Sequence, residues 1–428
     1  MRVSVDDGGT TGKPRCQPLL PAGARAGVVR HPDPEPAHLG YEHRRQAFAQ
    51  RLLVHVPVHR VDGRPERGEL LEHRLRDDVA GVEDDVGRAE ALDARVREAP
   101  PAGPGPTYGA RFFEPVAEAA LVLGLDLGAR FLRAGLCDLR GTVRARHDVE
   151  LRTPDADLVL ESLPGLVEGL VAAAGLEGAP IDGAVVGVPG AVDRDRDTIH
   201  LVENVAGLDG RRFGREVGER LGLRASVYND INLAALAEGR SGAARGVDDF
   251  AFVSVGTGLG AGLVLRGELH RGHHGAAGEL DFASAGLGEE IDPCAAALAA
   301  VAERLADGRR TVLAPPYGGP EIFAAAAAGD EVAREVVAEE ARRIALHVVP
   351  VAAVTDVGLV VLGGGIGANV QLLDGIRALL ERWLPYPPRV EISSLGDAAV
   401  LHGALAVGVE EALENVFLRP RPGFSPSS

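Results

Sequence analysis

LVLGLDLGARFLRAGLCDLRG, residues 121–141, predicts an apolar strand, a tight glycine turn, a second strand and another turn. The same order occurs again in DFAFVSVGTGLGAGLVLRGELHRG, residues 249–272. One copy stands at the start of each half of the chain beyond residue 119, so the sequence indicates an internal duplication. Two similar halves would leave a cleft between them, which is a preferred place for a small ligand.

The segments around these two copies alternate between helical and strand patterns, which predicts an α/β architecture. Buried strands running into Pro-Gly or glycine-rich turns are expected at 181–192 and 357–369. A further strand is expected to end at Asn229-Asp230. Helices are predicted over 157–176, 213–223, 231–238, 331–354 and 396–413, the last with small residues suited to close packing.

Composition narrows the class of protein. The chain has 428 residues, of which 46% are hydrophobic and 25% charged, as is typical of globular proteins. A net charge of −17 argues against a protein that coats nucleic acid, although a local DNA-binding face is compatible with it. No apolar run long enough to span a membrane and no signal core are visible, so we expect a cytoplasmic protein. Three widely spaced cysteines predict neither a disulfide framework nor a metal knuckle.

Residues 1–118 differ in character from the rest. They hold 17 basic and 19 acidic residues, so most of the negative charge lies beyond them. A weak strand pattern covers 52–61, polar helices are predicted over 66–99, and 100–109 resembles a Pro/Gly linker. A wrongly assigned start codon or a shifted reading frame over these codons would produce the contrast. Sequencing the transcript tests this hypothesis, and peptides from an intact frame would dismiss it.

Three glycine-rich turns follow buried strands and are candidate phosphate or nucleotide loops. Glycine lets the backbone approach a phosphate closely, and Asp126 at a strand end could hold Mg²⁺. Each turn taken alone is equally well explained as an ordinary hairpin or strand–helix turn. The candidate residues are Asp126, Gly128, Gly256, Thr257, Gly258, Gly260, Gly364 and Gly365.

Asn229-Asp230 and Glu279 are the candidate polar groups for a polyol. The carboxylate of Asp230 could accept a proton from a sugar hydroxyl, and Asn229 could hold a neighbouring hydroxyl. The competing interpretation is that an Asx residue here simply caps the following helix. His270, His273 and His274 form no ligand set with nearby cysteines or carboxylates, so we expect a solvated loop there, and Glu279 is the better polyol ligand.

The order of these motifs resembles the ROK family of repressors, open reading frames and sugar kinases. The resemblance rests on DLGARFLRAGLCDLRG, VGVPGAV, NDINLAALAEG, VSVGTGLGAGLVLRGELHRGHHGAAGE, VLGGGIG and LGDAAVLHGAL, and covers about residues 119–415. It implies an actin-like ATPase fold of two ribonuclease-H-like lobes that close over a sugar and ATP. By resemblance, Gly190, Asn204, Asn229 and Glu279 would face the sugar, Asp230 would be the general base, and the glycine loops would line ATP and Mg²⁺.

The resemblance also implies a domain organisation. Residues 1–118 would be an atypical extension in place of a winged helix-turn-helix, because the sequence pattern of that motif is not recognisable here. The first lobe would cover 119–245 and the second 246–395. A C-terminal helix at 396–415 would pack back on the first lobe before a tail at 416–428. A homodimer is the family expectation.

Two departures from the family pattern bear on function. Family kinases carry a histidine three residues after the glutamate that matches Glu279, whereas this chain has Phe282, which can neither bind a hydroxyl nor zinc. The cysteine-rich zinc loop is reduced to Cys294, so no structural zinc is expected; Glu289 or Glu290 is a candidate substitute ligand for the sugar. This erosion favours a sugar-responsive transcriptional regulator that binds a sugar or sugar phosphate, and DNA if a DNA-binding arm exists. The alternatives are an ATP-dependent sugar kinase of glucokinase type and a non-catalytic ROK-like protein.

Overall fold

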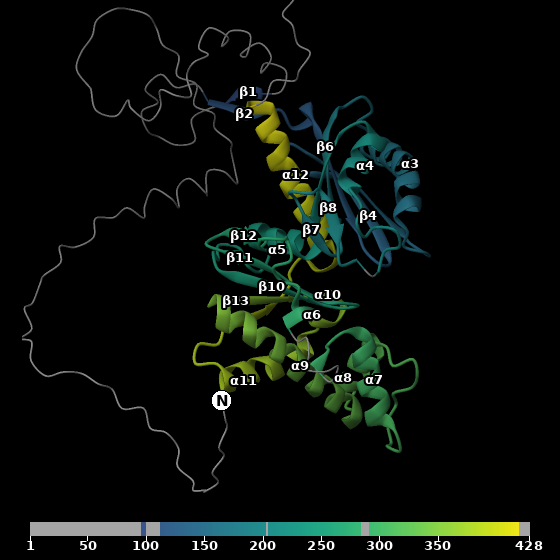
Figure 1. Ribbon diagram of the computed structural model, residues 1–428, viewed down its shortest axis with the longest axis vertical. Helices are drawn as coiled ribbons and strands as arrows, with labels where there is room; N and C mark the ends of the chain where they lie inside the picture. The colour runs from purple at the N-terminus through teal and green to yellow at the C-terminus, as the bar shows by residue number, and fades with distance from the viewer. Residues whose placement is uncertain (1–95, 100–111, 203, 284–290, 419–428) are drawn as a thin grey trace, which may run out of the picture. The chain divides into compact units, whose positions relative to one another are not determined.

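The computed structural model describes residues 96–99, 112–202, 204–283 and 291–418, which are drawn as ribbon in Figure 1. Within them lie two five-stranded sheets. The first sheet contains β3 (Leu121–Leu127), β4 (Phe131–Asp138), β5 (Val143–Glu150), β6 (Ile181–Val188) and β9 (Arg224–Asn229). Its strand order is β5-β4-β3-β6-β9. The first three strands along the chain pair antiparallel, and β6 and β9 join parallel to β3.

The second sheet repeats this topology. It contains β10 (Phe250–Val255), β11 (Leu259–Leu265), β12 (Glu268–His270), β13 (Leu359–Gly363) and β14 (Arg389–Ile392), in the order β12-β11-β10-β13-β14. Again the first three strands are antiparallel and the last two are parallel to the first. The predicted duplication of an α/β unit is therefore confirmed.

The first sheet is covered by helices from distant parts of the chain. α3 (Ala156–Ala174) contacts β4 and β5, and α4 (Phe213–Leu221) contacts β9 and α3. α12 (Ala399–Leu418) contacts β3, β4 and β6 and also packs on α5 (Asp230–Ser241). Leucine and valine side chains of β3 and β6 alternate between these two layers of helices, because successive residues of a strand point to opposite faces.

The second sheet packs one face against a helical layer. α9 (Glu331–Thr355) contacts α7 (Ala295–Ala306), α8 (Gly319–Ala327), α11 (Leu373–Trp383) and β10. The long helix expected at 331–354 is thus confirmed, with Pro350 inside it. α5 contacts β10 and β11, so the helix that follows Asn229 also touches the second sheet. The described residues contain no helix with the length and apolarity needed to cross a membrane.

Close helix packing at α5 depends on small residues. A Cβ on Gly403 of α12 would lie 2.0 Å from the carbonyl oxygen of Leu233, and a Cβ on Gly262 of β11 would lie 2.6 Å from the Cβ of Ala235. Any side chain at either glycine would push these elements apart. α5 is therefore held tightly between α12 and β11, and its N-terminus, which carries Asp230, is fixed in space.

The predicted polar helix over 66–99 is wrong at its C-terminal end. Residues Val96–Ala99 form the strand β1, which pairs antiparallel with β2 (Phe112–Pro115). A two-stranded pairing replaces helical hydrogen bonds here because β2 offers a partner that local sequence could not reveal. The predictions for 52–61, 66–95 and 100–109 lie outside the described residues. The remaining short elements are η2 (Ala117–Ala119), β7 (Ala191–Asp193), β8 (Thr198–His200), α6 (Leu280–Ala283), α10 (Gly364–Gly367), η4 (Val370–Leu372) and η5 (Gly396–Ala398).

Candidate functional site

Asn229 and Asp230 lie at the junction where β9 ends and α5 begins. The Oδ1 atom of Asn229 accepts a hydrogen bond from the backbone N–H of Asn232 at 2.9 Å, so the capping interpretation is correct. The Nδ2 atom of the same side chain donates to the carbonyl of Gly190 at 3.0 Å. The two interpretations are therefore compatible. The Asn229 side chain caps α5, and it also holds the Gly190 turn next to the start of that helix.

Asp230 carries a carboxyl group whose ionisation is costly. It is half-buried, and its Oδ1 atom accepts from the backbone N–H of Ile231 at 2.8 Å. Loss of hydration, together with the negative charges of Asp126 and Glu279, raises the pKa of Asp230 to about 7. The structure therefore brings these three predicted carboxylates within electrostatic reach of one another, and it holds Asp230 near half-ionisation at neutral pH.

Asp126 has a partner that the sequence analysis missed. It is 4% exposed near the end of β3, and its Oδ2 atom accepts from the guanidinium of Arg133 at 3.0 Å. Burial raises the pKa of Asp126 to about 6 despite the attraction of Arg133. The hairpin register places Arg133 directly opposite Asp126, so a register prediction from the turn at 128–130 could have found the pair.

This arrangement does not fit a magnesium site. Mg²⁺ is held by hard oxygen ligands, usually one or two carboxylates with water, and a guanidinium already neutralises the carboxylate here. Among the described residues, no group of three or more His, Cys, Asp or Glu side chains is arranged to hold a metal ion.

Gly260 and Glu279 lie beside the start of α5. A Cβ on Gly260 would come within 2.4 Å of the Cδ1 atom of Ile231, the residue after Asp230. The backbone N–H of Ala261 donates to the carbonyl of Gly278 at 2.7 Å, which fixes the turn that carries Glu279. Glu279 is half-buried, and burial together with the charge of Asp281 raises its pKa. This turn, β11 and the α5 N-terminus therefore meet.

The second and third glycine-rich turns also meet. A Cβ on Gly256 would lie 3.5 Å from the backbone nitrogen of Gly365. Gly364 has a φ of +80°, and a Cβ there would lie 2.3 Å from the carbonyl oxygen of Val255, so only glycine fits. The N–H of Ala295, the first residue of α7, donates to the carbonyl of Gly256 at 2.8 Å. Thr257 and Gly258 are exposed at the tip of the turn.

Gly128 and Asn204 are not joined to these groups by the contacts above. Gly128 closes its own hairpin, with its N–H donating to the carbonyl of Phe131 at 2.9 Å. Asn204 is exposed in the loop that follows β8.

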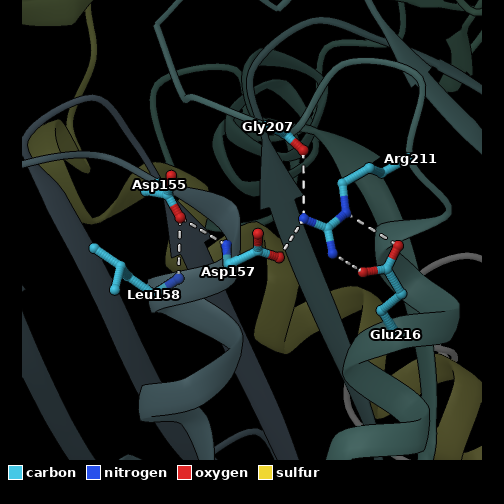
Figure 2. Close-up of polar contacts among 6 residues, drawn as sticks. All are labelled: Asp155, Asp157, Leu158, Gly207, Arg211 and Glu216. Carbon is cyan, nitrogen blue, oxygen red and sulfur yellow. Dashed lines mark hydrogen bonds and ion pairs between the residues drawn. The ribbon is translucent and has the colours of Figure 1, made fainter.

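Arg211, at the far end of the Asn204 loop, anchors it (Figure 2). Its guanidinium donates hydrogen bonds to the carboxylate of Asp157 at 2.6 Å and to the carbonyl of Gly207. It also forms a bidentate ion pair with Glu216. The loop is thereby fastened to the first turns of both α3 and α4, and Asp155 caps α3 beside it.

Of the two residues that mark the family departures, Cys294 is buried and Phe282 faces solvent. Phe282, in α6, is 62% exposed. His273 and His274 are exposed and meet edge to face with ring centroids 4.5 Å apart. Glu289 and Glu290 lie outside the described residues.

The duplicated sheets and the converging turns define a two-lobed protein of the actin-like ATPase fold, the class of ROK sugar kinases and regulators. The protein-family model described as ROK family matches residues 122–411, so the chain belongs to this family.

Relatives in the family have different activities. The chain is 31% identical over 314 residues to a glucokinase of Streptomyces coelicolor, covering 66% of this chain and 96% of the relative. It is 26% identical over 318 residues to a putative xylose repressor of Caldicellulosiruptor, covering 68% and 79%. A solved ROK family glucokinase from Streptomyces griseus, in complex with glucose and AMPPNP, matches with a TM-score of 0.57 and 27% identity over 68% of this chain and all of that one.

Proposed function

We propose that this chain is a sugar-responsive transcriptional regulator of the ROK family. The observation that carries the proposal is the ion pair between Asp126 and Arg133, whose side chain is 18% exposed. A kinase needs a metal ion to neutralise charge on the transferring phosphoryl group. The guanidinium of Arg133 occupies the carboxylate of Asp126, which is the candidate metal ligand. This arrangement suits a protein that binds its ligand without converting it.

Two further features support the regulator. Phe282 stands where family kinases carry histidine, so one ligand for the sugar is missing. One relative is named as a putative xylose repressor, and we extend the role of repressor to this chain as part of the proposal. A sugar held by Asn229, Asp230 and Glu279 would favour one arrangement of the protein, and DNA affinity would change with that population.

DNA binding is tested with the full-length chain and fragments of its source genome. We expect selective retention of a small set of fragments, and a change in their affinity when one sugar of a panel is added. Binding to all fragments with equal affinity at physiological salt would contradict the proposal, because it would indicate only phosphate attraction.

The ion pair is tested by Arg133→Ala, with Arg146→Ala as the matched control. Arg146 lies on β5, the strand next to β4, and its guanidinium hydrogen-bonds Asp148 of the same strand. Its charge acts on Asp126 less strongly than that of Arg133, which hydrogen-bonds Asp126 directly. We expect Mg²⁺-dependent ATP binding, measured by calorimetry, to be stronger in Arg133→Ala than in the unmodified chain and unchanged in the control. Stronger binding in the unmodified chain than in Arg133→Ala would contradict the proposal.

A sugar kinase is the second candidate, and the pKa of Asp230 is the observation that favours it. A base with a pKa of about 7 can accept the proton of an attacking sugar hydroxyl at neutral pH and release it afterwards. Backbone amides of the glycine-rich turns would hold the phosphates of ATP. Turnover of ATP with any hexose that disappears in Asp230→Asn would establish this candidate and overturn the regulator. If the chain shows neither selective DNA binding nor turnover of ATP, the non-catalytic alternative remains.

A further inference from the structure

A small pocket is lined by Asn229 together with Val192 of β7. Its enclosed space is about 10 Å³, which is room for about one oxygen atom, and the rest of its space is open to solvent. The pocket therefore takes only one atom group of a ligand whose remainder lies outside it. Its walls are formed by Val192, Arg194, Val227, Tyr228, Asn229, Asn232, Arg271 and Gly275. Asn229 is shared with the proposed sugar site, so the pocket and that site are neighbours.

Two arginines meet on one tyrosine ring in this pocket. The guanidinium carbons of Arg194 and Arg271 each lie 5.1 Å from the ring centre of Tyr228, which is 7% exposed. Among the residues that the structure describes, neither guanidinium forms an ion pair with a carboxylate. Burial and the nearby charge of Arg194 lower the pKa of Arg271. Two like charges therefore face each other without an anion between them.

The carboxylate of Glu411, which lies near both guanidinium groups, is engaged by hydroxyl groups. Glu411 on α12 accepts hydrogen bonds from the hydroxyl of Tyr228 at 3.1 Å and from the hydroxyl of Ser226 at 3.0 Å. These bonds fix the tyrosine ring as a platform. The cluster of two arginines and one glutamate retains a net positive charge, so it is complementary to a ligand with a negative group.

The shape of the pocket is fixed by the packing of the 271–277 loop against β7. A Cβ on Gly275, whose φ is +75°, would lie 2.2 Å from the carbonyl oxygen of Val192, so glycine is required for the loop to press against β7. The N–H of Ala277 donates to the carbonyl of Arg271 at 3.1 Å and holds the loop in shape. This packing brings Arg271 to Arg194 across 77 residues of sequence.

An unpartnered polar atom gives the second indication of a ligand. Asn232 is 5% exposed and lines the pocket, and its Oδ1 atom has no hydrogen-bond partner among the described residues. A buried carbonyl oxygen without a donor is costly, so such groups normally find a partner. A hydroxyl group of a ligand beside Asn229 would supply the donor.

From these observations we infer that the pocket of Arg194, Tyr228, Asn232 and Arg271 takes the anionic group of a phosphorylated or acidic sugar whose hydroxyls are held at Asn229. Arginine binds phosphate and carboxylate groups through paired N–H donors, which gives both charge and direction. The inference rests on the proposed sugar-binding function and specifies its ligand: a polyol with a negative group, in preference to a neutral sugar.

The test is calorimetric titration of the full chain with glucose, glucose 6-phosphate, gluconate and inorganic phosphate. We expect glucose 6-phosphate or gluconate to bind at least about tenfold more tightly than glucose, which corresponds to about 1.4 kcal/mol. Whichever of the two binds more tightly identifies the anionic group. Inorganic phosphate binding as tightly as glucose 6-phosphate would overturn the inference, since no sugar would then be required.

Charge removal distinguishes this pocket from general attraction of anions. Arg194→Gln and Arg271→Gln should each abolish the preference for the anionic sugar while glucose affinity stays the same. Arg196→Gln is the matched control, because Arg196 is exposed on the same loop and pairs with Asp193. Arg194 is itself exposed, so its variant is expected to fold even where Arg271→Gln does not.

The outcomes separate the two proposals. An anionic preference that survives both substitutions, or that is lost equally in Arg196→Gln, would overturn the anion pocket and leave the sugar site intact. Failure of every sugar to bind, neutral or charged, would overturn the proposed function and the pocket with it.

Discussion

At the scale of single residues, buried carboxyl groups determine how the protein responds to pH. Asp126, Asp230 and Glu340 each have a pKa above its ordinary value, and burial is the main cause in every case. A carboxyl with a raised pKa in the folded state binds protons more tightly there than in the unfolded chain. Each therefore makes the free energy of unfolding fall as the pH rises from about 5 toward the folded pKa.

Glu340 provides the clearest test. It is fully buried in α9, neither carboxyl oxygen has a hydrogen-bond partner among the described residues, and its pKa is raised to about 8. We expect Glu340→Gln to match the unmodified chain in stability at pH 5. At pH 8 it should be more stable, by an amount on the order of 4 kcal/mol, since the pKa of Glu340 rises from 4.5 to about 8 and one pKa unit corresponds to about 1.4 kcal/mol. Urea unfolding at the two pH values measures the difference.

The neighbouring Glu339 is the control, with the opposite sign. Arg342 and Arg343 hold the pKa of Glu339 below its ordinary value. Glu339→Gln should therefore lose stability at pH 8, and this loss should vanish once the pH falls below the usual range of a glutamate. Identical effects of Glu340→Gln at pH 5 and pH 8 would show that Glu340 does not titrate in the folded protein.

At the scale of elements, replacement by alanine should change the free energy of unfolding in opposite directions at two helical glycines. Gly403→Ala places a methyl group against the backbone of Leu233 and should lower the free energy of unfolding by about 1–3 kcal/mol. Gly169, in α3, has open space around its Cβ position, so Gly169→Ala should raise stability by about 0.5–1 kcal/mol. Chemical denaturation of both variants measures this. A neutral or stabilising Gly403→Ala would contradict the close packing of α12 on α5.

The anchoring of the Asn204 loop by Arg211 leads to another prediction. Arg211→Gln removes the contacts with Asp157 and Glu216 (Figure 2) and should weaken sugar binding on the order of fivefold, equivalent to about 1 kcal/mol. Arg215→Gln, on the exposed face of α4, should change neither binding nor stability by more than about 0.5 kcal/mol. If Arg211→Gln lowers stability and leaves sugar affinity unchanged, Asn204 is not a ligand.

At the scale of the whole molecule, Glu238 joins parts of the chain that are far apart in sequence. It is fully buried near the end of α5 and accepts hydrogen bonds from Ser393, from the N–H of Leu395 at 3.1 Å and from the N–H of Ala243 at 2.6 Å. The segment 393–396 leads from β14 of the second sheet to α12, which packs on the first. One carboxylate thus fastens α5 to the crossing between the two sheets.

Removing this carboxylate should have a large effect. Glu238→Ala leaves two backbone N–H groups without an acceptor and should cost about 3 kcal/mol or more of unfolding free energy. Ser394→Ala, whose hydroxyl lies 3.4 Å from the same carboxylate, should cost less than about 1 kcal/mol. Denaturant unfolding followed by circular dichroism compares them. A small effect of Glu238→Ala would mean that the crossing is held by apolar packing alone.

Much of the fold was predictable from residues 119–415 because its determinants are local. Alternation of apolar residues, strands ending in glycine and the repeated strand-turn-strand unit are all written along the chain, and so is the Asn229 helix cap. The end of the predicted helix over 66–99 was wrong because strand pairing of 96–99 depends on a partner beyond the linker. The candidate site residues were chosen from the same local signals, and their roles stay proposals.

The pairings between distant segments of the site were decided only by tertiary structure. Arg271 reaches Arg194 through the fit of a loop on β7, and Gly256 meets Gly365 because β10 and β13 are neighbours in a sheet. The pair of Arg133 and Asp126 is local, because it follows from the register of one hairpin. Sequence patterns encode which residues turn or become buried. Electrostatic effects weaken with distance and are screened by salt over about 10 Å. The charges close to each carboxyl or guanidinium, and with them the chemistry of the site, therefore follow from folding.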